Sequence, residues 1–541
     1  MSLVVSSELI NATQHPALKR YRAVNEQHRE REVEISSKDI SSEVLNDLIA
    51  AAKHVDDKKA DRAFESILSA LSGKFDKPVP SFTAFKGVLE SFLKHKAIDG
   101  WLYATGNDGL LYPHLVMKVV YDDGKRSSRD KPQPTVSIHT MCYGFKSDGN
   151  RDAKIGVYSR TFSFYPGAVV RRRIADILAE EGIYKETPAL REEYQASIKR
   201  HRGLTQDAFA QQFRVSGRPY AYDDPYRRNS VELINRRVVH DLEPKDFGVI
   251  VRHGESYIFE GREDADDAAV VPEHPVVKVF DLQTHEFFWV HADNMTPYVY
   301  NKSLRDKLIL PESHRDLLDV LTTDIGAFVQ DFIEGKSAGN VILCKGVPGV
   351  GKTLTAEVYA ELIDRPLYMV HSGELGTTAD KIQESLEEIF QRGKRWDCVL
   401  LLDEADVFVV QRGNNIEQNA IVAEFLRALE YFDGLLFMTT NRPDDIDDAI
   451  ISRCAAIIDY SPPTEKAAAA IWRVMATQFE AKLDDDMVDK LVSLFPGIAA
   501  RDIKMLFRLA LRVSLSKKQE LTLDTFRMCA MFRAIKMKTG D

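Results

Sequence analysis

The clearest chemical pattern in this sequence is a glycine-rich run that ends in a lysine and a threonine. It reads Gly346-Val347-Pro348-Gly349-Val350-Gly351-Lys352-Thr353, and Leu354 follows it. A Gly, four residues and Gly-Lys-Thr is the pattern of a phosphate-binding loop, in which backbone N–H groups turn inward around phosphate oxygens. The lysine would reach the β- and γ-phosphates of a nucleotide, and the threonine hydroxyl would ligate Mg²⁺. The run therefore predicts a binding site for ATP and Mg²⁺.

The segments around this run supply the strand, turn and helix that a phosphate-binding loop needs. Residues 340–344 are apolar and partly β-branched, which predicts a strand, and residues 354–362 predict a helix. The positive end of that helix dipole would face the phosphates. A chance glycine-rich turn is the alternative, and the next motif argues against it.

A pair of carboxylates follows a second apolar strand further along the chain. Residues 399–402 form a continuous apolar run, which is typical of a strand buried on both faces of a parallel sheet. Asp403 and Glu404 come at its carboxyl end, where α/β sheets bind ligands. Asp403 would hold Mg²⁺ through its water shell, and Glu404 would polarise the attacking water. A solvated strand end with acidic caps is the alternative.

A third strand, predicted over residues 434–440, ends at Asn441, and residues 446–453 follow it and end at Arg453. With these elements, residues 305–541 resemble the AAA+ ATPases and, within them, the AAA clade. The resemblance makes residues 346–353 the Walker A motif and residues 400–404 the Walker B motif.

The same resemblance implies roles for three residues outside the Walker motifs. It makes Asn441 the sensor 1 residue that orients the attacking water, and it makes Arg453 an arginine finger. Arg501, in a segment that opens a helix, matches a sensor 2 arginine of a C-terminal lid. A surface cap residue is the alternative for Arg453, and a solvated charge in the first turn of a helix is the alternative for Arg501.

The resemblance also implies a fold, an activity and an assembly. The fold is α/β, with a parallel-sheet AAA+ core and a helical lid. The activity is Mg²⁺-dependent hydrolysis of ATP to ADP and phosphate in a ring of identical subunits, expected to be a hexamer. The core is similar to that of the mitochondrial AAA translocase of the Rieske protein, which implies that Asp324 and Ile325 line the adenine pocket. A packing role is the alternative for these two residues.

Two positions depart from the clade. Residues 452–456 hold one arginine where the clade carries two, so nucleotide sensing between subunits is expected to be simpler. Residues 372–378, which replace the aromatic pore loop of protein-threading members, contain no aromatic residue. The second departure argues against processive threading of a client and leaves Leu375 as a candidate pore contact.

The sequence before the ATPase region predicts two further parts. Residues 1–95 predict a helical segment, and residues 96–304 predict a β-rich α+β domain for a substrate or partner. This domain, with residues 373–377 and 402–408, resembles a little-characterised AAA group. Its helices are expected near residues 168–181 and 188–201. Its strands are expected at residues 101–103, 115–121, 135–145, 154–165, 248–252, 256–260, 276–280 and 286–291. The ATPase core is expected over residues 305–462 and the lid over residues 463–541.

Composition and charge restrict the classes of function. The chain has 541 residues, is 44% hydrophobic and 28% charged, and carries a formal net charge of −10. No apolar run approaches the roughly 18 residues of a membrane span, and the N-terminus lacks the features of a signal peptide. The five cysteines show no CxxC pair, so buried reduced thiols in a cytoplasmic protein are expected.

Neither the basic residues nor the histidines indicate a further site. The densest basic cluster, residues 171–173, is expected to be a solvated helix face, so charge does not indicate a nucleic-acid partner. His285, His291 and His371 lack metal-ligand spacing to cysteine or to other histidines.

These observations together predict an AAA+ ring motor that remodels or translocates a macromolecular client, with protein as the favoured client. Two alternatives remain open. One is a nucleic-acid-dependent AAA+ ATPase, such as a defence or mobile-element factor, which stimulation by DNA would favour. The other is a nucleotide-switched scaffold without turnover, against which the intact Glu404 argues.

Overall fold

The computed structural model divides the chain into two compact units. The first comprises Met1–Phe209 and Phe213–Pro297, and the second comprises Ala210–Gln212 and Tyr298–Asp541. The structure describes residues 2–28, 32–36, 39–58, 60–61, 64, 68, 75, 78–79, 82–124, 133–145, 155–222, 232–242, 271–323, 340–376, 378–413 and 416–538. The expected division into four domains stays a prediction.

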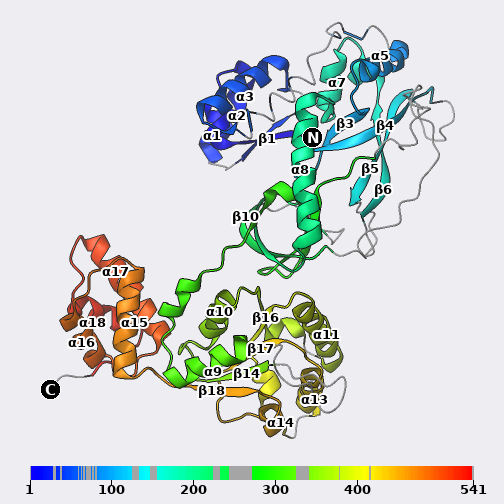
Figure 1. Ribbon diagram of the computed structural model, residues 1–541. Coiled ribbons are helices and arrows are strands. Elements are labelled where there is room, and N and C mark those ends of the chain that lie inside the picture. Colours follow the sequence, from blue (N-terminus) through cyan, green and yellow to red (C-terminus); the bar gives the residue numbers. More distant parts are fainter. Residues whose placement is uncertain are drawn as a thin grey trace. The chain divides into compact units, whose positions relative to one another are not determined.

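The first unit is built around two larger antiparallel sheets and a two-stranded one (Figure 1). One sheet has the order β6-β5-β4-β3-β7 and the other β13-β8-β10-β11-β12-β9. Its strands are β1 Ser2–Ser6, β2 Glu32–Ser36, β3 Trp101–Thr105, β4 Leu111–Asp122, β5 Thr135–Phe145, β6 Ile155–Phe164, β7 Ile183–Lys185, β8 Gln212–Gly217, β9 Ala221–Tyr222, β10 Leu233–His240, β11 Val276–Asp281, β12 Phe287–His291 and β13 Met295–Pro297. Its helices are α1 Ser7–Ala12, η1 Pro16–Leu18, α2 Lys19–His28, α3 Ser42–His54, α5 Phe82–Lys94, α6 Pro166–Val169, α7 Ile174–Glu180, α8 Pro188–Asp207 and η4 Ala292–Asn294.

The β-rich character predicted for residues 96–304 is confirmed by strands β3 to β13, and β11 and β12 form a hairpin. These strands pair in register from Val276 opposite His291 to Phe280 opposite Phe287. The strands expected at residues 248–252 and 256–260 lie outside the described residues. The helix expected over residues 188–201 is confirmed as α8, which extends to Asp207.

The prediction of a mainly helical segment over residues 1–95 did not include β1 and β2, which form an antiparallel pair there. The sequence of β2 is Glu-Val-Glu-Ile-Ser, an alternation of polar and apolar residues with the period of a strand. Val33 and Ile35 are buried and lie on one face of it. The surrounding helical periodicity obscured this short signal.

The continuous helix expected over residues 168–181 is also wrong, because it is broken at the arginine cluster. Arg171 has a φ of 66°, in the left-handed region, and Arg173 is the N-cap of α7. Each remaining arginine of the cluster is paired within the unit, Arg172 with Glu180 and Arg173 with Asp176. The cluster is therefore a turn held by local ion pairs and not a solvated helix face.

The second unit contains a parallel sheet of five strands in the order β15-β16-β17-β14-β18. The strands are β14 Asn340–Gly346, β15 Leu367–His371, β16 Val399–Asp403, β17 Leu435–Thr440 and β18 Ala456–Tyr460. All six residues of β17 are buried, as are the first four of β16. Continuous apolar strands of this kind are buried on both faces of a parallel sheet.

Helices connect these strands and cover both faces of the sheet (Figure 1). They are η5 Lys302–Lys307, α9 Glu312–Thr323, α10 Lys352–Leu362, η6 Ser372–Leu375, α11 Ala379–Arg395, α12 Asp406–Val409, α13 Ile416–Glu430 and α14 Asp448–Ile451. The chain passes from β14 to the far edge and then returns strand by strand. Right-handed crossovers therefore place α10 on one face and both α11 and α13 on the other.

Four helices after β18 form a small bundle with its own core. They are α15 Glu465–Gln478, α16 Asp485–Leu494, α17 Ala500–Lys517 and α18 Leu523–Phe532. Trp472 is fully buried, and its ring meets Phe526 edge-on with centroids 5.5 Å apart. A parallel α/β core with a C-terminal helical lid, preceded by a β-rich unit, confirms the predicted fold class. In the described part of the chain, no helix is long and apolar enough to cross a membrane.

Candidate active site

The glycine-rich run forms the turn between β14 and α10 and has the backbone that only glycine adopts freely. Gly346 has a φ of 144°, and a Cβ there would lie 2.1 Å from the carbonyl oxygen of Tyr460. Gly351 has a φ of 108° and is the N-cap of α10. A Cβ added at Gly351 would meet no atom within 4 Å, so the space in front of the helix start is open. The loop thus has room for phosphate oxygens at the positive end of α10.

Lys352 is brought to the end of two neighbouring strands. Its Nζ donates to the carbonyl oxygens of Gly346 at 2.7 Å and Val347 at 2.8 Å, and to Oδ1 of Asn441 at 2.9 Å. Burial lowers the pKa of Lys352, while the nearby carboxylates of Asp406 and Asp403 oppose that effect. The residues expected to neutralise phosphate and to orient water therefore already touch.

The hydroxyl and carboxylate predicted to hold Mg²⁺ are also adjacent. Thr353 Oγ1 donates to Asp403 Oδ1 at 2.9 Å, and Thr439 Oγ1 donates to the same oxygen at 2.6 Å. Mg²⁺ takes oxygen ligands and is usually bound by one or two protein groups together with water and substrate phosphates. This donor set fits that ion, with Thr353 and Asp403 as the residues that would hold it.

Glu404 lies in the turn that ends β16, with its side chain exposed. Its φ of 54° is left-handed, which is uncommon for a residue other than glycine. The conformation is held by β17, because the N–H of Glu404 donates to Thr439 Oγ1 at 3.0 Å and the N–H of Ala405 donates to the carbonyl oxygen of Thr439 at 2.8 Å. Strained backbone held in this way is common at active sites. The carboxylate therefore lies in solvent directly beside Asp403, as activation of a water requires.

Two residues of this site were missed from the sequence. Asp406 Oδ1 accepts from Thr440 Oγ1 at 2.6 Å and from the N–H of Asn441 at 2.9 Å, so Asp406 fixes the end of β17. Thr439 joins Asp403 to the backbone of Glu404. The available signals were a third carboxylate after Asp403 and Glu404, and a Thr-Thr pair at the end of an apolar strand.

Replacing Asp406 by alanine is expected to lower ATP turnover by about 10- to 100-fold, because small misplacements of an orienting group have effects of that size. The substitution removes the acceptor that fixes the backbone of Asn441. Steady-state phosphate release measures the effect. Asp380→Ala is the matched control, since Asp380 is likewise an acidic residue in the first turn of a helix, α11. Equal turnover in the two variants would contradict the positioning role.

The structure places Arg501 against the phosphate-binding loop. Its N–H donates to the carbonyl oxygen of Gly349 at 2.9 Å, and a Cβ at Gly349 would lie 3.0 Å from that of Arg501. Its guanidinium is close enough to Lys352 to contribute to lowering the pKa of that lysine. A residue of the lid thus reaches the same cradle as Lys352.

Arg453 lies two residues after the end of α14 and contacts Ala449 and Glu430. Its Nη1 donates to the carbonyl oxygen of Ala449 at 3.1 Å, and its Nη2 lies 3.7 Å from a carboxylate oxygen of Glu430. Its side chain is one-third exposed. None of the hydrogen bonds or ion pairs described for Arg453 joins it to the phosphate-binding loop of its own chain.

Two further expectations concern the adenine pocket and the pore contact, and the structure tests only the second. Asp324 and Ile325, expected at the adenine, lie outside the described residues. Leu375, the candidate pore contact, is only 1% exposed and ends η6. A side chain buried in its own subunit does not meet a client, so the interpretation of Leu375 as a pore contact is wrong.

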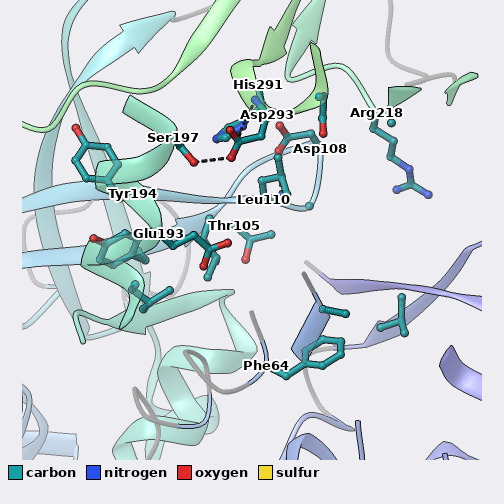
Figure 2. A pocket seen from close by; sticks show the side chains of 18 of the residues that line it. Phe64, Thr105, Asp108, Leu110, Glu193, Tyr194, Ser197, Arg218, His291 and Asp293 are labelled. Carbon is teal, nitrogen blue, oxygen red and sulfur yellow. Dashed lines mark hydrogen bonds and ion pairs between the residues drawn. The ribbon is translucent and has the colours of Figure 1, made fainter. Parts of the chain in front are cut away.

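A separate cavity of about 340 Å³ lies in the first unit (Figure 2). It is lined by parts of the N-terminal helices, β3, α8 and the segment around η4. Ser197 Oγ donates to Asp293 Oδ2 at 2.5 Å, and Tyr103 contributes a buried hydroxyl that has no hydrogen-bond partner among the residues the structure describes. This cavity is distinct from the phosphate-binding loop, which belongs to the second unit.

Comparison with known proteins places a family domain over the loop and strands described above. Residues 342–462 match the family described as "ATPase family associated with various cellular activities (AAA)". The human "ATPase family gene 2 protein homolog B" is 27% identical over 217 residues, which cover 38% of this chain and 27% of that protein. The chain thus spans little more than a quarter of that relative's length.

Two other proteins also match parts of this chain. The "Probable 26S proteasome regulatory subunit 10B" of Caenorhabditis elegans is 24% identical over 267 residues, which cover 44% of this chain and 64% of that protein. A crystal structure of the FIGL-1 AAA domain in complex with ADP matches 43% of this chain and 84% of that chain, with 17% identity and a TM-score of 0.35.

Proposed function

Because this chain carries an AAA ATPase domain, we propose that it hydrolyses ATP and uses the hydrolysis to remodel a macromolecular client, which we take to be protein. The observation that carries the proposal is the meeting of Lys352, Asp403 and Asn441 at the carboxyl ends of β14, β16 and β17. Three groups from distant parts of the sequence converge on one open cradle, as phosphoryl transfer requires.

Each residue has a separate task in this proposal. Lys352 neutralises the β- and γ-phosphates, and Mg²⁺, when bound by Thr353 and Asp403, supplies further positive charge there. The exposed carboxylate of Glu404 accepts a proton from the attacking water. The side-chain amide of Asn441 orients that water; its Oδ1 accepts from Lys352, and the backbone N–H of Asn441 donates to Asp406. The backbone of Gly346 to Leu354 binds the phosphates, and Arg501 responds to the γ-phosphate from the lid.

We propose that catalysis needs a neighbouring subunit, because the guanidinium of Arg453 contacts Ala449 and Glu430 and not its own loop. A ring of identical subunits places the same residue of each neighbour at every site, and a hexamer is the expected closure. A protein client is supported by the relative whose name makes it a subunit of the proteasome regulatory particle.

The decisive test of a protein client is capture by a hydrolysis-deficient protein. The Glu404→Gln variant, incubated with ATP and a cell extract, should retain a protein that the wild type releases after turnover. The same capture without nucleotide, or with Lys352→Ala, is the control. Capture that is independent of ATP in all three samples would contradict coupling, and stimulation of hydrolysis by DNA would favour the nucleic-acid-dependent alternative.

A chain that starts at Tyr298 is expected to bind ATP but to lose the client. The long continuous part of the second unit begins at that residue and contains every described residue of the ATP site. Nucleotide binding by calorimetry and capture of the client found with the full chain measure the two properties. Full capture by the shortened chain would show that recognition lies in the second unit.

A further inference from the structure

Three side chains that commonly bind metals meet in the interior of the first unit. They are His114, Cys142 and His274, and they are 1%, 0% and 2% exposed. One ligating atom from each lies within 4.8 Å of those of the other two. None of the three is used in the proposed ATPase site, which belongs to the other unit.

Strand register explains why residues so distant in sequence meet. In β4 and β5, Leu115 lies opposite Met141, so the preceding position places His114 opposite Cys142. His274 reaches the same place because its N–H donates to the carbonyl oxygen of Tyr143 at 2.7 Å. Gly144 makes room for it, since a Cβ there would lie 2.9 Å from His274 Nδ1.

The hydrogen bonds of the two imidazoles leave one nitrogen of His274 unprotonated and one nitrogen of His114 without a partner among the described residues. His274 Nε2 lies 3.1 Å from the carbonyl oxygen of Pro113, which only accepts, so Nε2 carries the proton and Nδ1 keeps its lone pair. His114 Nδ1 is buried and has no hydrogen-bond partner among the described residues. An imidazole that donates one N–H to a backbone carbonyl and offers the other nitrogen is the usual arrangement of a metal ligand.

We propose that His114, Cys142 and His274 bind one Zn²⁺ ion. Histidine nitrogen and cysteine sulfur are the preferred ligands of this ion, which is four-coordinate in proteins and leaves one position for a further ligand. The Tyr220 hydroxyl lies 3.4 Å from His274 Nδ1, and either this hydroxyl or a water would occupy that one position. The ion would also satisfy the buried Nδ1 of His114, for which the described part of the chain provides no hydrogen-bond partner.

Binding of the ion to these ligands requires the loss of one proton, from the thiol of Cys142. Burial lowers the pKa of His274 to about 3, so its imidazole is neutral without any ion. Burial raises the pKa of Cys142 to about 12, although a hydrogen bond with Tyr158 and the charge of Arg160 act in the opposite direction. On binding, the S–H bond of Cys142 breaks, a zinc–sulfur bond forms and one proton passes to solvent.

The bound ion would stabilise side chains that form one wall of the cavity in the first unit. The Tyr112 ring lies between the cluster and the cavity, with its centroid 4.9 Å from that of His274 and 5.6 Å from that of His291. Its hydroxyl donates to Asp108 Oδ2 at 2.5 Å. His291 and Asp108 both line the cavity (Figure 2). Metal binding would thus stabilise the part of the cavity wall that these two side chains form.

Cobalt spectroscopy of the full chain tests the proposal without relying on activity. Metal-free wild-type protein is titrated with Co²⁺ and observed in the near ultraviolet, where a thiolate bound to cobalt gives a charge-transfer band. The expected result is a band that saturates at one equivalent of Co²⁺ and disappears when Zn²⁺ is added. A Mg²⁺ site made of oxygen ligands does not give this band. Its absence from folded wild-type protein would overturn the proposal.

The cysteines provide matched controls, because all five lie in the described part of the chain and none forms a disulfide. Cys142→Ser should abolish the band, whereas Cys344→Ser, Cys398→Ser, Cys454→Ser and Cys529→Ser should each keep it. His114→Ala should weaken Co²⁺ binding by at least about tenfold. His240→Ala, a fully buried histidine of the same unit outside the cluster, should leave binding unchanged. A band that persists in Cys142→Ser would place the ion elsewhere and refute this site.

Discussion

Replacing Glu404 by glutamine is expected to leave ATP bound while hydrolysis falls by about 10²- to 10⁴-fold, the usual contribution of a positioned general base. Glutamine has nearly the same shape, so the left-handed turn at this position and its hydrogen bond to Thr439 should persist. Only the ability to accept a proton is lost. The phosphate-binding loop and Lys352 are unaltered, and the affinity for ATP should change little.

Lys352→Ala is the contrasting variant and should lose nucleotide binding itself. Lys352 is the buried cation of the cradle, and its removal leaves the phosphates without their main neutralising group. Asn441 Oδ1 would lose its donor at the same time. Binding of a fluorescent ATP analogue and single-turnover hydrolysis separate the two effects. Loss of binding to the same extent in both variants would refute the separate roles of the two residues.

Arg453→Ala should keep ATP affinity and lose most turnover, by roughly 10³- to 10⁵-fold if the guanidinium acts as an arginine finger supplied by a neighbour. In its own chain Arg453 lies at the end of α14, where it contacts Ala449 and Glu430. Removing it therefore leaves the cradle of the same subunit unchanged. The loss should appear only in assembled protein, where the arginine meets the γ-phosphate of the adjacent site.

Mixing of subunits makes this prediction sharper. Arg453→Ala and Glu404→Gln proteins carry defects on opposite sides of one interface, and each should be inactive alone. In mixed assemblies, some interfaces would join an intact Glu404 to an intact neighbouring Arg453 and recover part of the activity. Mass measurement confirms that mixed assemblies form. Activity of an isolated monomer at the full wild-type rate would contradict a role in trans.

The ATPase core was predictable because its signals are local. Apolar runs of strand length end in polar residues with defined chemistry, and the glycines of the loop are needed where the backbone adopts positive φ. The placement of Lys352 beside Asn441 follows once the strands are parallel, because their carboxyl ends share one edge of the sheet. The contact of Arg501 with Gly349 joins the lid to the loop and could not be derived from spacing.

The wrong predictions share a different cause. At these residues, tertiary contacts determined the structure, and local sequence patterns did not. The helix expected over residues 168–181 breaks because Arg172 and Arg173 pair with Glu180 and Asp176 around a left-handed turn. Leu375 was expected to be a pore contact, yet its side chain is buried.

The residue groups missed from the sequence have the same cause. Asp406 gained its role only through the end of a neighbouring strand. His114, Cys142 and His274 show no short-range metal spacing, and the sheet register and a backbone hydrogen bond bring them together.

The hydrogen bond from Arg501 to Gly349 has a mechanical consequence. Arg501 is in the first turn of α17, a helix of 18 residues and therefore about 27 Å long. A rigid rod attached at one end amplifies rotation, so a tilt that moves its attached turn by a fraction of an ångström displaces the far end several times further. The phosphate-binding loop and α17 thus form a lever whose short arm lies at Gly349 of the loop.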